Sequence, residues 1–293
     1  MVTSRGMLKT ALGAIGYIVS EPEEASSTGP QSTPLICFHA SPRCFDEYLE
    51  ILPLFPNRRI VALDAPGYGI SENPIKSCSI DDIADAFLEV IEDLKIDKFV
   101  VVGNLMGNFI GISLASRYPE RVTASICANL YYFQASTAEE NAAKKAERKD
   151  GEPIADSWVL EEDGKHLVDL HSRRKWLSPE LNVRVVQGEL TYLVNRRERY
   201  AKGISIEDLS EYKFEPAAQS VHCPTLCIKG VAALGFFDMI GYEGTKQFET
   251  GVKFFKHAEV ASLEGEKSTI NMINQDPEGF ASLCKTFLDK HNL

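Results

Sequence analysis

Residues 98–107 read KFVVVGNLMG, an apolar run that ends at one glycine and is followed four residues later by another. A short run rich in valine and bounded by turn residues predicts a buried β-strand. Comparable runs lie elsewhere along the chain, at 34–39, 59–64, 122–128, 224–230 and 258–263. We therefore expect residues 98–103 to be one strand of a buried sheet.

Helical patterns alternate with these runs. Residues 79–95 carry apolar side chains at helical spacing after Ser79, a residue type that caps helix N-termini. The last helix is expected to begin at Asp276-Pro277, because proline suits the first turn. Residues 7–20 add a predicted hairpin. Strands that alternate with helices predict βαβ units, and hence an α/β fold with a mostly parallel sheet.

The alternation stops between about residues 133 and 220. Residues 136–150 begin with a capping box and are polar on every face, and further helical stretches lie near 164–176 and 179–200. We interpret residues 134–220 as a helical lid inserted after the sixth strand, with 1–133 and 221–293 forming the core. Such a lid covers the C-terminal edge of the strands, where open α/β sheets bind ligands.

Composition excludes several function classes. The 293 residues suit one α/β domain, and a net charge of −11 argues against a nucleic-acid partner and against adhesion to anionic lipid. The N-terminal stretch is too broken for a secretory signal or a membrane span. Seven cysteines form neither a disulfide framework nor a metal-binding spacing. We expect no metal, no cofactor, and a reducing compartment such as the cytoplasm.

Five short motifs follow one another along the chain. They are His39-Ala40-Ser41-Pro42, Leu63-Asp64-Ala65-Pro66-Gly67-Tyr68-Gly69-Ile70-Ser71, Val102-Gly103-Asn104-Leu105-Met106-Gly107, Ser116-Arg117-Tyr118-Pro119-Glu120-Arg121-Val122 and Cys223-Pro224-Thr225-Leu226-Cys227-Ile228-Lys229-Gly230. The series resembles the α/β-hydrolase superfamily, in particular its lidded branch of epoxide hydrolases, haloalkane dehalogenases and meta-cleavage-product hydrolases. The resemblance implies an α/β-hydrolase fold with an eight-stranded, mostly parallel sheet flanked by helices.

The resemblance also implies where a catalytic triad should lie, and this chain departs from it at each place. The nucleophile belongs at the centre of a G-x-S-x-G elbow, where this sequence has Leu105. The acid follows the seventh strand, where Ala233 stands, and the histidine follows the eighth strand, at or near Ile270. None of these side chains is a nucleophile, an acid or a base. We therefore expect no serine-hydrolase chemistry.

The same resemblance predicts which residues surround a ligand. His39 is expected to be structural, whereas the backbone N–H groups of Ser41 and Met106 would point into a pocket and favour a carbonyl or anionic oxygen. Leu105 is expected to take a positive φ and to make the former reaction centre apolar. The predicted ligand-binding residues are His39, Ser41, Asn104, Leu105, Met106, Tyr131, Trp176 and Phe236.

Three functions stay open at this point. The first is a binding protein for a small apolar molecule, or for a protein partner, without hydrolysis. The second is an enzyme with relocated chemistry, such as a lyase, isomerase or cofactor-free oxygenase that uses Ser41, His39, Lys229 or a tyrosine. The third is a non-catalytic scaffold. A titratable group with a perturbed pKa inside the pocket would favour the second, and a sealed pocket or none would favour the third.

Overall fold

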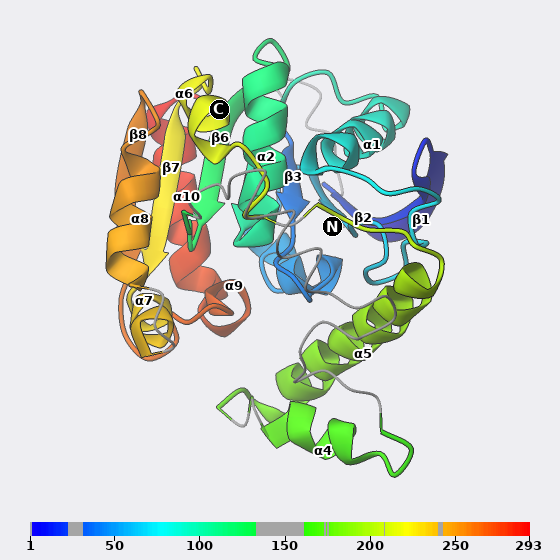
Figure 1. Ribbon diagram of the computed structural model, residues 1–293. Coiled ribbons are helices and arrows are strands. Elements are labelled where there is room, and N and C mark those ends of the chain that lie inside the picture. The colour runs from blue at the N-terminus through cyan, green and yellow to red at the C-terminus, as the bar shows by residue number, and fades with distance from the viewer. Residues whose placement is uncertain are drawn as a thin grey trace.

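One eight-stranded sheet runs through the molecule, and helices cover both of its faces (Figure 1). The computed structural model describes residues 2–22, 32–132, 161–172, 174, 176–207, 209–239 and 243–293. Within these residues the strands are β1 (Val2–Thr10), β2 (Gly13–Glu21), β3 (Leu35–Phe38), β4 (Ile60–Leu63), β5 (Phe99–Asn104), β6 (Val122–Ala128), β7 (Thr225–Gly230) and β8 (Ala258–Leu263). Their order across the sheet is β1-β2-β4-β3-β5-β6-β7-β8.

The sheet is parallel except at one edge. β3, β4, β5, β6, β7 and β8 pair in parallel with their neighbours, whereas β2 is antiparallel to both β1 and β4. All residues of β3, β4 and β5 are buried, as expected where a parallel sheet is covered on both faces. The predicted α/β-hydrolase fold with a mostly parallel eight-stranded sheet is confirmed.

Alternate side chains of the central strands pack into two separate cores, one on each face of the sheet. Phe38 belongs to the core shared with α1 (Ile80–Asp93) and α2 (Met106–Arg117), and its ring stacks on that of Phe87 with centroids 5.3 Å apart. Cys37, the preceding residue of β3, belongs to the opposite core, together with Phe280 and Phe287 of α10 (Pro277–Lys290). This alternation is the two-residue period of a strand.

The predicted strands agree with the observed ones to within about a residue, apart from the N-terminal hairpin. The hairpin spans residues 2–21 and not 7–20, with β1 paired to β2 from Val2. Because β1 is an edge strand and most of its residues are exposed or half-buried, its first half carries no apolar run that a sequence pattern would detect.

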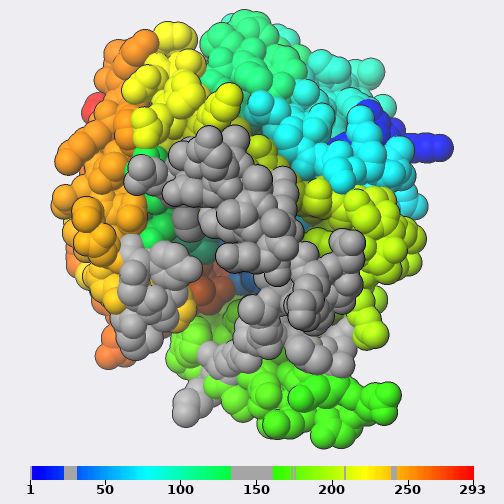
Figure 2. Space-filling model, viewed as in Figure 1, coloured from blue at the N-terminus to red at the C-terminus, as the bar shows by residue number. Residues whose placement is uncertain are grey.

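Three helices of the described residues lie between β6 and β7: α4 (Lys165–Ser172), α5 (Pro179–Ala201) and α6 (Phe214–Gln219). α4 packs on α5 through Leu170, Val186 and Leu193, and this pair extends away from the sheet (Figures 1 and 2). The C-terminal half of α5 is tied to the core, since Asn195 Nδ2 donates to the carbonyl of Gly67 at 3.1 Å. The predicted helix at 136–150 lies outside the described residues.

Among the described helices, none combines the length and the apolar character that a membrane span requires.

Candidate functional site

The turn from β5 into α2 is a strained elbow. Leu105 connects the two elements with φ 48° and ψ −109°. A Cβ on Gly107 would lie 1.9 Å from the carbonyl oxygen of Phe38, and one on Gly103 would lie 2.6 Å from the backbone of Gly107, so neither position admits a side chain. The expected positive φ of Leu105 is confirmed. A non-glycine residue held in such a region costs on the order of 1–3 kcal/mol.

The Leu105 side chain lies apart from both cores. It is half-buried, and it belongs to none of the core clusters formed by the described apolar residues. Its neighbours Asn104 and Met106 are both buried. The side chain therefore points away from the packed interior at the carboxyl end of β5, as a nucleophile would in this turn.

A buried carboxylate lies beneath the elbow. Glu47, in the 3₁₀ helix η1 (Phe45–Tyr48), is fully buried, and its Oε2 accepts from the backbone N–H of Ala40 at 2.7 Å. Its Oε1 accepts from Asn104 Nδ2 at 2.8 Å and lies 3.9 Å from Arg43 Nη1. Burial raises the pKa of Glu47, while the Arg43 charge and these hydrogen bonds act in the opposite direction.

Amide side chains extend this network across the sheet edge. Asn104 Nδ2 also donates to the carbonyl of Ile270 at 3.1 Å, and Asn129 Nδ2 donates to Asn104 Oδ1 at 3.2 Å. Asn129 Oδ1 in turn accepts from the N–H of Gly230 at 3.2 Å. The ends of β5, β6 and β7 and the segment after β8 are thus joined by side-chain hydrogen bonds.

Sequence reasoning identified Asn104 but missed Glu47 and Asn129. Glu47 lies among Asp46 and Glu50 in one short stretch, so composition does not reveal which carboxylate is buried. A better signal exists for Asn129, because an asparagine directly after a buried strand is suited to the positive φ of 46° that it adopts.

His39 is held in a structural environment. Its ring is buried, Nε2 accepts from the N–H of Ala65 at 2.9 Å, and Nδ1–H donates to the carbonyl of Ala40 at 2.8 Å. Burial lowers the pKa of His39 to about 4, so the imidazole is neutral at pH 7. Because both ring nitrogens are engaged with the backbone, neither is available to a substrate.

Ser41 and Met106 lie beside a pair of stacked tyrosines. Ser41 Oγ and the Tyr68 hydroxyl are 3.0 Å apart, and the same hydroxyl lies 3.7 Å from Met106 Sδ. Tyr68 stacks on Tyr192 of α5 with ring centroids 4.6 Å apart. Among the described residues no acceptor is paired with the backbone N–H of Ser41 or Met106. Two donors therefore remain beside Leu105, where the resemblance predicts an oxyanion hole.

Hydrogen bonds join the chain segments that follow β7 and β8. Helix α7 (Val231–Met239) begins directly after β7, and the N–H groups of Ala232 and Ala233 donate to Ser268 Oγ and to its carbonyl, both at 3.0 Å. Ser268 Oγ donates to the carbonyl of Gly265 at 2.6 Å. Ala233 is fully buried and Ile270 is half-buried. These two predicted triad positions carry no titratable group.

The remaining predicted ligand-binding residues fall into two places. Tyr131 is buried and its ring lies 4.7 Å from that of Phe237 on α7, next to the half-buried Phe236. Trp176 is 49% exposed, between α4 and α5, and makes no ring contact with another described aromatic residue. The structure therefore brings His39, Ser41, Asn104, Leu105 and Met106 together and leaves Trp176 outside that group.

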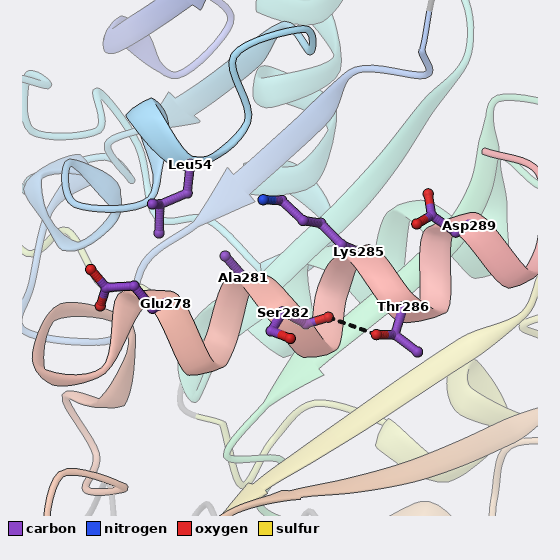
Figure 3. A pocket seen from close by; sticks show the side chains of 7 residues that line it. All are labelled: Leu54, Glu278, Ala281, Ser282, Lys285, Thr286 and Asp289. Atoms are coloured by element: carbon purple, nitrogen blue, oxygen red, sulfur yellow. Dashed lines mark hydrogen bonds between the residues drawn. The ribbon is translucent and has the colours of Figure 1, made fainter.

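A surface groove of about 260 Å³ lies elsewhere, along α10 and the 3₁₀ helix η2 (Leu52–Leu54) (Figure 3). It shares no lining residue with the elbow, and three of its lining side chains, Glu278, Lys285 and Asp289, are charged. Mixed charges along one helix face are typical of a solvated surface. The described residues contain no cluster of three or more His, Cys, Asp or Glu side chains arranged to hold a metal.

Comparisons with known proteins agree with this geometry. A family model described as alpha/beta hydrolase fold matches residues 33–170. Epoxide hydrolase 1 of Caenorhabditis elegans is 35% identical over 107 residues, which is 35% of this chain and 26% of that protein. The 2-hydroxymuconate semialdehyde hydrolase of Pseudomonas sp. (strain CF600) is 39% identical over 70 residues, 24% of this chain and 25% of that protein. The chain thus spans about a quarter of the length of these relatives.

Solved structures are similar over nearly the whole chain. A hydrolase from Pseudomonas aeruginosa superposes with a TM-score of 0.70 and 16% identity, over 97% of this chain and 98% of that one. The enol-lactonase from Burkholderia xenovorans LB400 gives a TM-score of 0.66 and 15% identity, over 97% and 100% of the two chains. At such low identity these similarities show the fold alone.

Proposed function

Because this chain belongs to the α/β-hydrolase superfamily, we propose that it is a member without serine-hydrolase activity that binds a small apolar molecule at the former reaction centre. The observation that carries this proposal is Leu105. It occupies the strained elbow at φ 48°, yet its side chain lies outside the cores and has no reactive atom. A turn that retains strain without packing its side chain is explained when that side chain contacts a ligand.

Groups with a shifted pKa lie near the elbow, as relocated catalysis would require, but we infer binding because their hydrogen bonds do not place them as a base for Ser41. Both nitrogens of His39 are engaged, and Asp64, whose pKa burial raises to about 7, accepts from the N–H groups of Phe45 and Ile70. Among the described residues the Ser41 hydroxyl is hydrogen-bonded to Tyr68, whose pKa burial raises well above its ordinary value. Tyr68 keeps its proton at neutral pH, and among the described residues no hydrogen bond joins Ser41 to His39 or Asp64, so none of the three is placed as a base for Ser41. A nucleophile without a base is inert.

Residues 134–220 serve in this proposal as a lid. Support comes from α5, whose Tyr192 stacks on Tyr68 and whose Asn195 binds the Gly67 carbonyl, so the helix reaches the loops beside the elbow. The same proposal includes a second form, in which a protein partner binds and responds to the position of α5. A reducing compartment is favoured because all seven cysteines are free.

Absence of hydrolysis is tested with a fluorophosphonate probe and with activated esters. We expect no covalent labelling and no turnover above a heat-denatured sample, because Leu105, Ala233 and Ile270 supply no triad. Leu105→Ser is expected to stay unlabelled, since a hydroxyl without a base remains protonated. Saturable ester turnover that the phosphonate abolishes would overturn this part of the proposal.

Ligand binding is tested with the neutral fluorophore N-phenyl-1-naphthylamine. Leu105→Glu places a charge at the centre of the proposed site, and we expect at least tenfold weaker binding. Val260→Glu is the matched control, because Val260 is 53% exposed on β8 and contributes to no core cluster. Equal affinity of the two variants and the wild type, or no binding by the wild type, would contradict an apolar site at Leu105.

A further inference from the structure

Arg199, near the end of α5, is a buried cation that has no carboxylate partner among the described residues. Its side chain is 4% exposed, and its Nη1 donates to Asn73 Oδ1 at 3.3 Å. The guanidinium carbon lies 5.7 Å from the ring centroid of Tyr192. Across the described part of the chain no Asp or Glu lies within ion-pair distance of it. An amide oxygen and an aromatic face compensate a buried positive charge only in part.

A second arginine of the same exposure shows what compensation looks like here. Arg43 is also 4% exposed, but its guanidinium lies 3.6 Å from Asp46 and 3.9 Å from Glu47. It also donates to Asn271 Oδ1 at 2.7 Å and to Asn274 Oδ1 at 3.0 Å. Arg43 thus has two acidic partners, whereas Arg199 has none in the described part of the chain, although the net charge of the protein is −11.

The unused side of the Arg199 guanidinium has the geometry of an anion-binding fork. Nη1 donates to Asn73, whereas Nε and Nη2 have no acceptor among the described residues. Nε and Nη2 are not among the fully enclosed polar atoms without a partner, so both remain accessible. These two donors lie in one plane and match the two oxygens of a carboxylate. Gly67 makes room for the group, because a Cβ there would lie 2.5 Å from Nη1.

A row of side chains leads from this fork to the elbow. Tyr192 lies against Arg199 on one side and stacks on Tyr68 at 4.6 Å on the other. The Tyr68 hydroxyl reaches Ser41 Oγ and Met106 Sδ, and Met106 follows Leu105 in the chain. Aromatic faces between a cation and an apolar centre suit a molecule with an anionic head and an apolar body.

We infer that Arg199 is a ligand-binding residue that takes the carboxylate of an amphiphilic organic acid through its Nε and Nη2 donors. The inference rests on the proposed function, since the apolar body of that acid would lie along the tyrosines toward Leu105. It requires the ligand to carry a negative charge, which binding at an apolar site alone does not require.

The test compares dodecanoate, methyl dodecanoate and dodecyl phosphate by titration calorimetry, below their aggregation concentrations. The wild type is expected to bind dodecanoate at least tenfold more tightly than its methyl ester, and Arg199→Met is expected to remove that preference. Arg196→Met is the matched control, because Arg196 lies one turn away, 6.0 Å from the same Tyr192 ring, and is expected to retain the preference.

The outcomes separate the two proposals. If the wild type binds acid and ester equally, or if Arg199→Met keeps the preference, the role of Arg199 is wrong while the apolar site stands. Tighter binding of dodecyl phosphate would replace the carboxylate by a phosphate as the ligand class and so overturn the inference as stated. If no probe binds, both proposals fail.

A melting experiment without ligand checks the charge argument. Arg199→Met is expected to melt at or above the wild-type temperature, because it removes an uncompensated buried charge and keeps most of the side-chain volume. Arg43→Met is expected to melt clearly lower, since it leaves Glu47 without its cation. A large loss of melting temperature in Arg199→Met alone would show a structural cation and overturn the inference.

Discussion

The end of β5 and the ends of β7 and β8 lie at the same edge of the sheet but are held in different ways. At β5 the turn is strained, with Leu105 at φ 48°, and hydrogen bonds of the buried Asn104 side chain to Glu47 and to the carbonyl of Ile270 fix the end of the strand. At β7 and β8 the N–H of Ala233 donates to the backbone carbonyl of Ser268, and the N–H of Ala232 donates to the Ser268 hydroxyl. No unfavourable φ is needed at those three residues.

This difference shows that the shape of the elbow does not depend on a reactive atom. Gly103 and Gly107 permit the close approach of neighbouring backbone, and Glu47 and Asn104 fix the strand end. Any side chain at position 105 would be presented in the same way. The ends of β7 and β8 are also held by hydrogen bonds, from Asn129 and Ser268, but the residues there adopt no strained φ and present no side chain in the way that the elbow presents Leu105. The following experiments test this contrast, beginning with the largest expected effect.

Glu47→Ala is expected to lower the free energy of unfolding by about 3–5 kcal/mol. The substitution leaves the buried Arg43 without one of its two carboxylates, and it removes the acceptor of the Ala40 and Asn104 donors. Urea unfolding measures the change. Glu266→Ala, at an exposed position in the loop after β8, is the control and should stay within about 0.5 kcal/mol of the wild type. Equal stabilities would mean that side chains do not hold the elbow.

The strands and the elbow were predictable from the sequence, whereas the network beneath the elbow was not. Buried strands such as residues 98–103 are recognisable because local composition decides them. Glu47 lies 57 residues before its partner Asn104, and only the assembled sheet brings them together. In the segment after β8 the sequence showed only that no histidine lies at or near Ile270, and it did not indicate a role for Ser268. Its bonds to Ala232 and Ala233 arise because β7 and β8 are adjacent, which is a tertiary property.

The next effect concerns pH and the loop that carries His39. Its pKa is about 4 in the folded protein and 6.5 in the unfolded chain, so between these values the unfolded state binds the extra proton. Stability is therefore lost as the pH falls from 6.5 to 4, by up to about 3 kcal/mol. The raised pKa of Asp64 has the opposite effect, since it increases stability as the pH falls from 6.5 to 4. Asp64 is present in both the wild type and the His39→Gln variant, so its effect cancels when the two are compared.

The measurement is the difference in unfolding free energy between wild type and His39→Gln across that pH range. The variant lacks the imidazole, so its stability should fall less toward pH 4 than that of the wild type. Parallel curves would show that His39 is protonated in the folded state, and the structural role assigned to it beside the elbow would be lost.

Ser268→Ala tests the closed ends of β7 and β8. The substitution removes the acceptor of the Ala232 N–H and the donor to Gly265, and we expect a loss of about 1–3 kcal/mol. Binding of N-phenyl-1-naphthylamine should be unchanged, because this region is a closure and not part of the site. A stability change within error, combined with weaker binding, would reverse the assignment and place Ser268 against the ligand.

Leu105→Gly gives the smallest expected change in stability and separates strain from packing. Glycine adopts φ 48° at little cost, which returns part of the 1–3 kcal/mol stored at the elbow, whereas loss of a half-buried side chain outside the cores costs little. We expect a gain of up to about 1 kcal/mol, together with weaker binding of the neutral fluorophore. Lys95→Gly is the matched control, since Lys95 has φ 57° but is exposed, so its change reports the backbone contribution alone. A loss of several kcal/mol for Leu105→Gly, against a gain for Lys95→Gly, would show that Leu105 fills a packed core. The contrast between a strained end of β5 with a proposed ligand site and the closed ends of β7 and β8 would then fail.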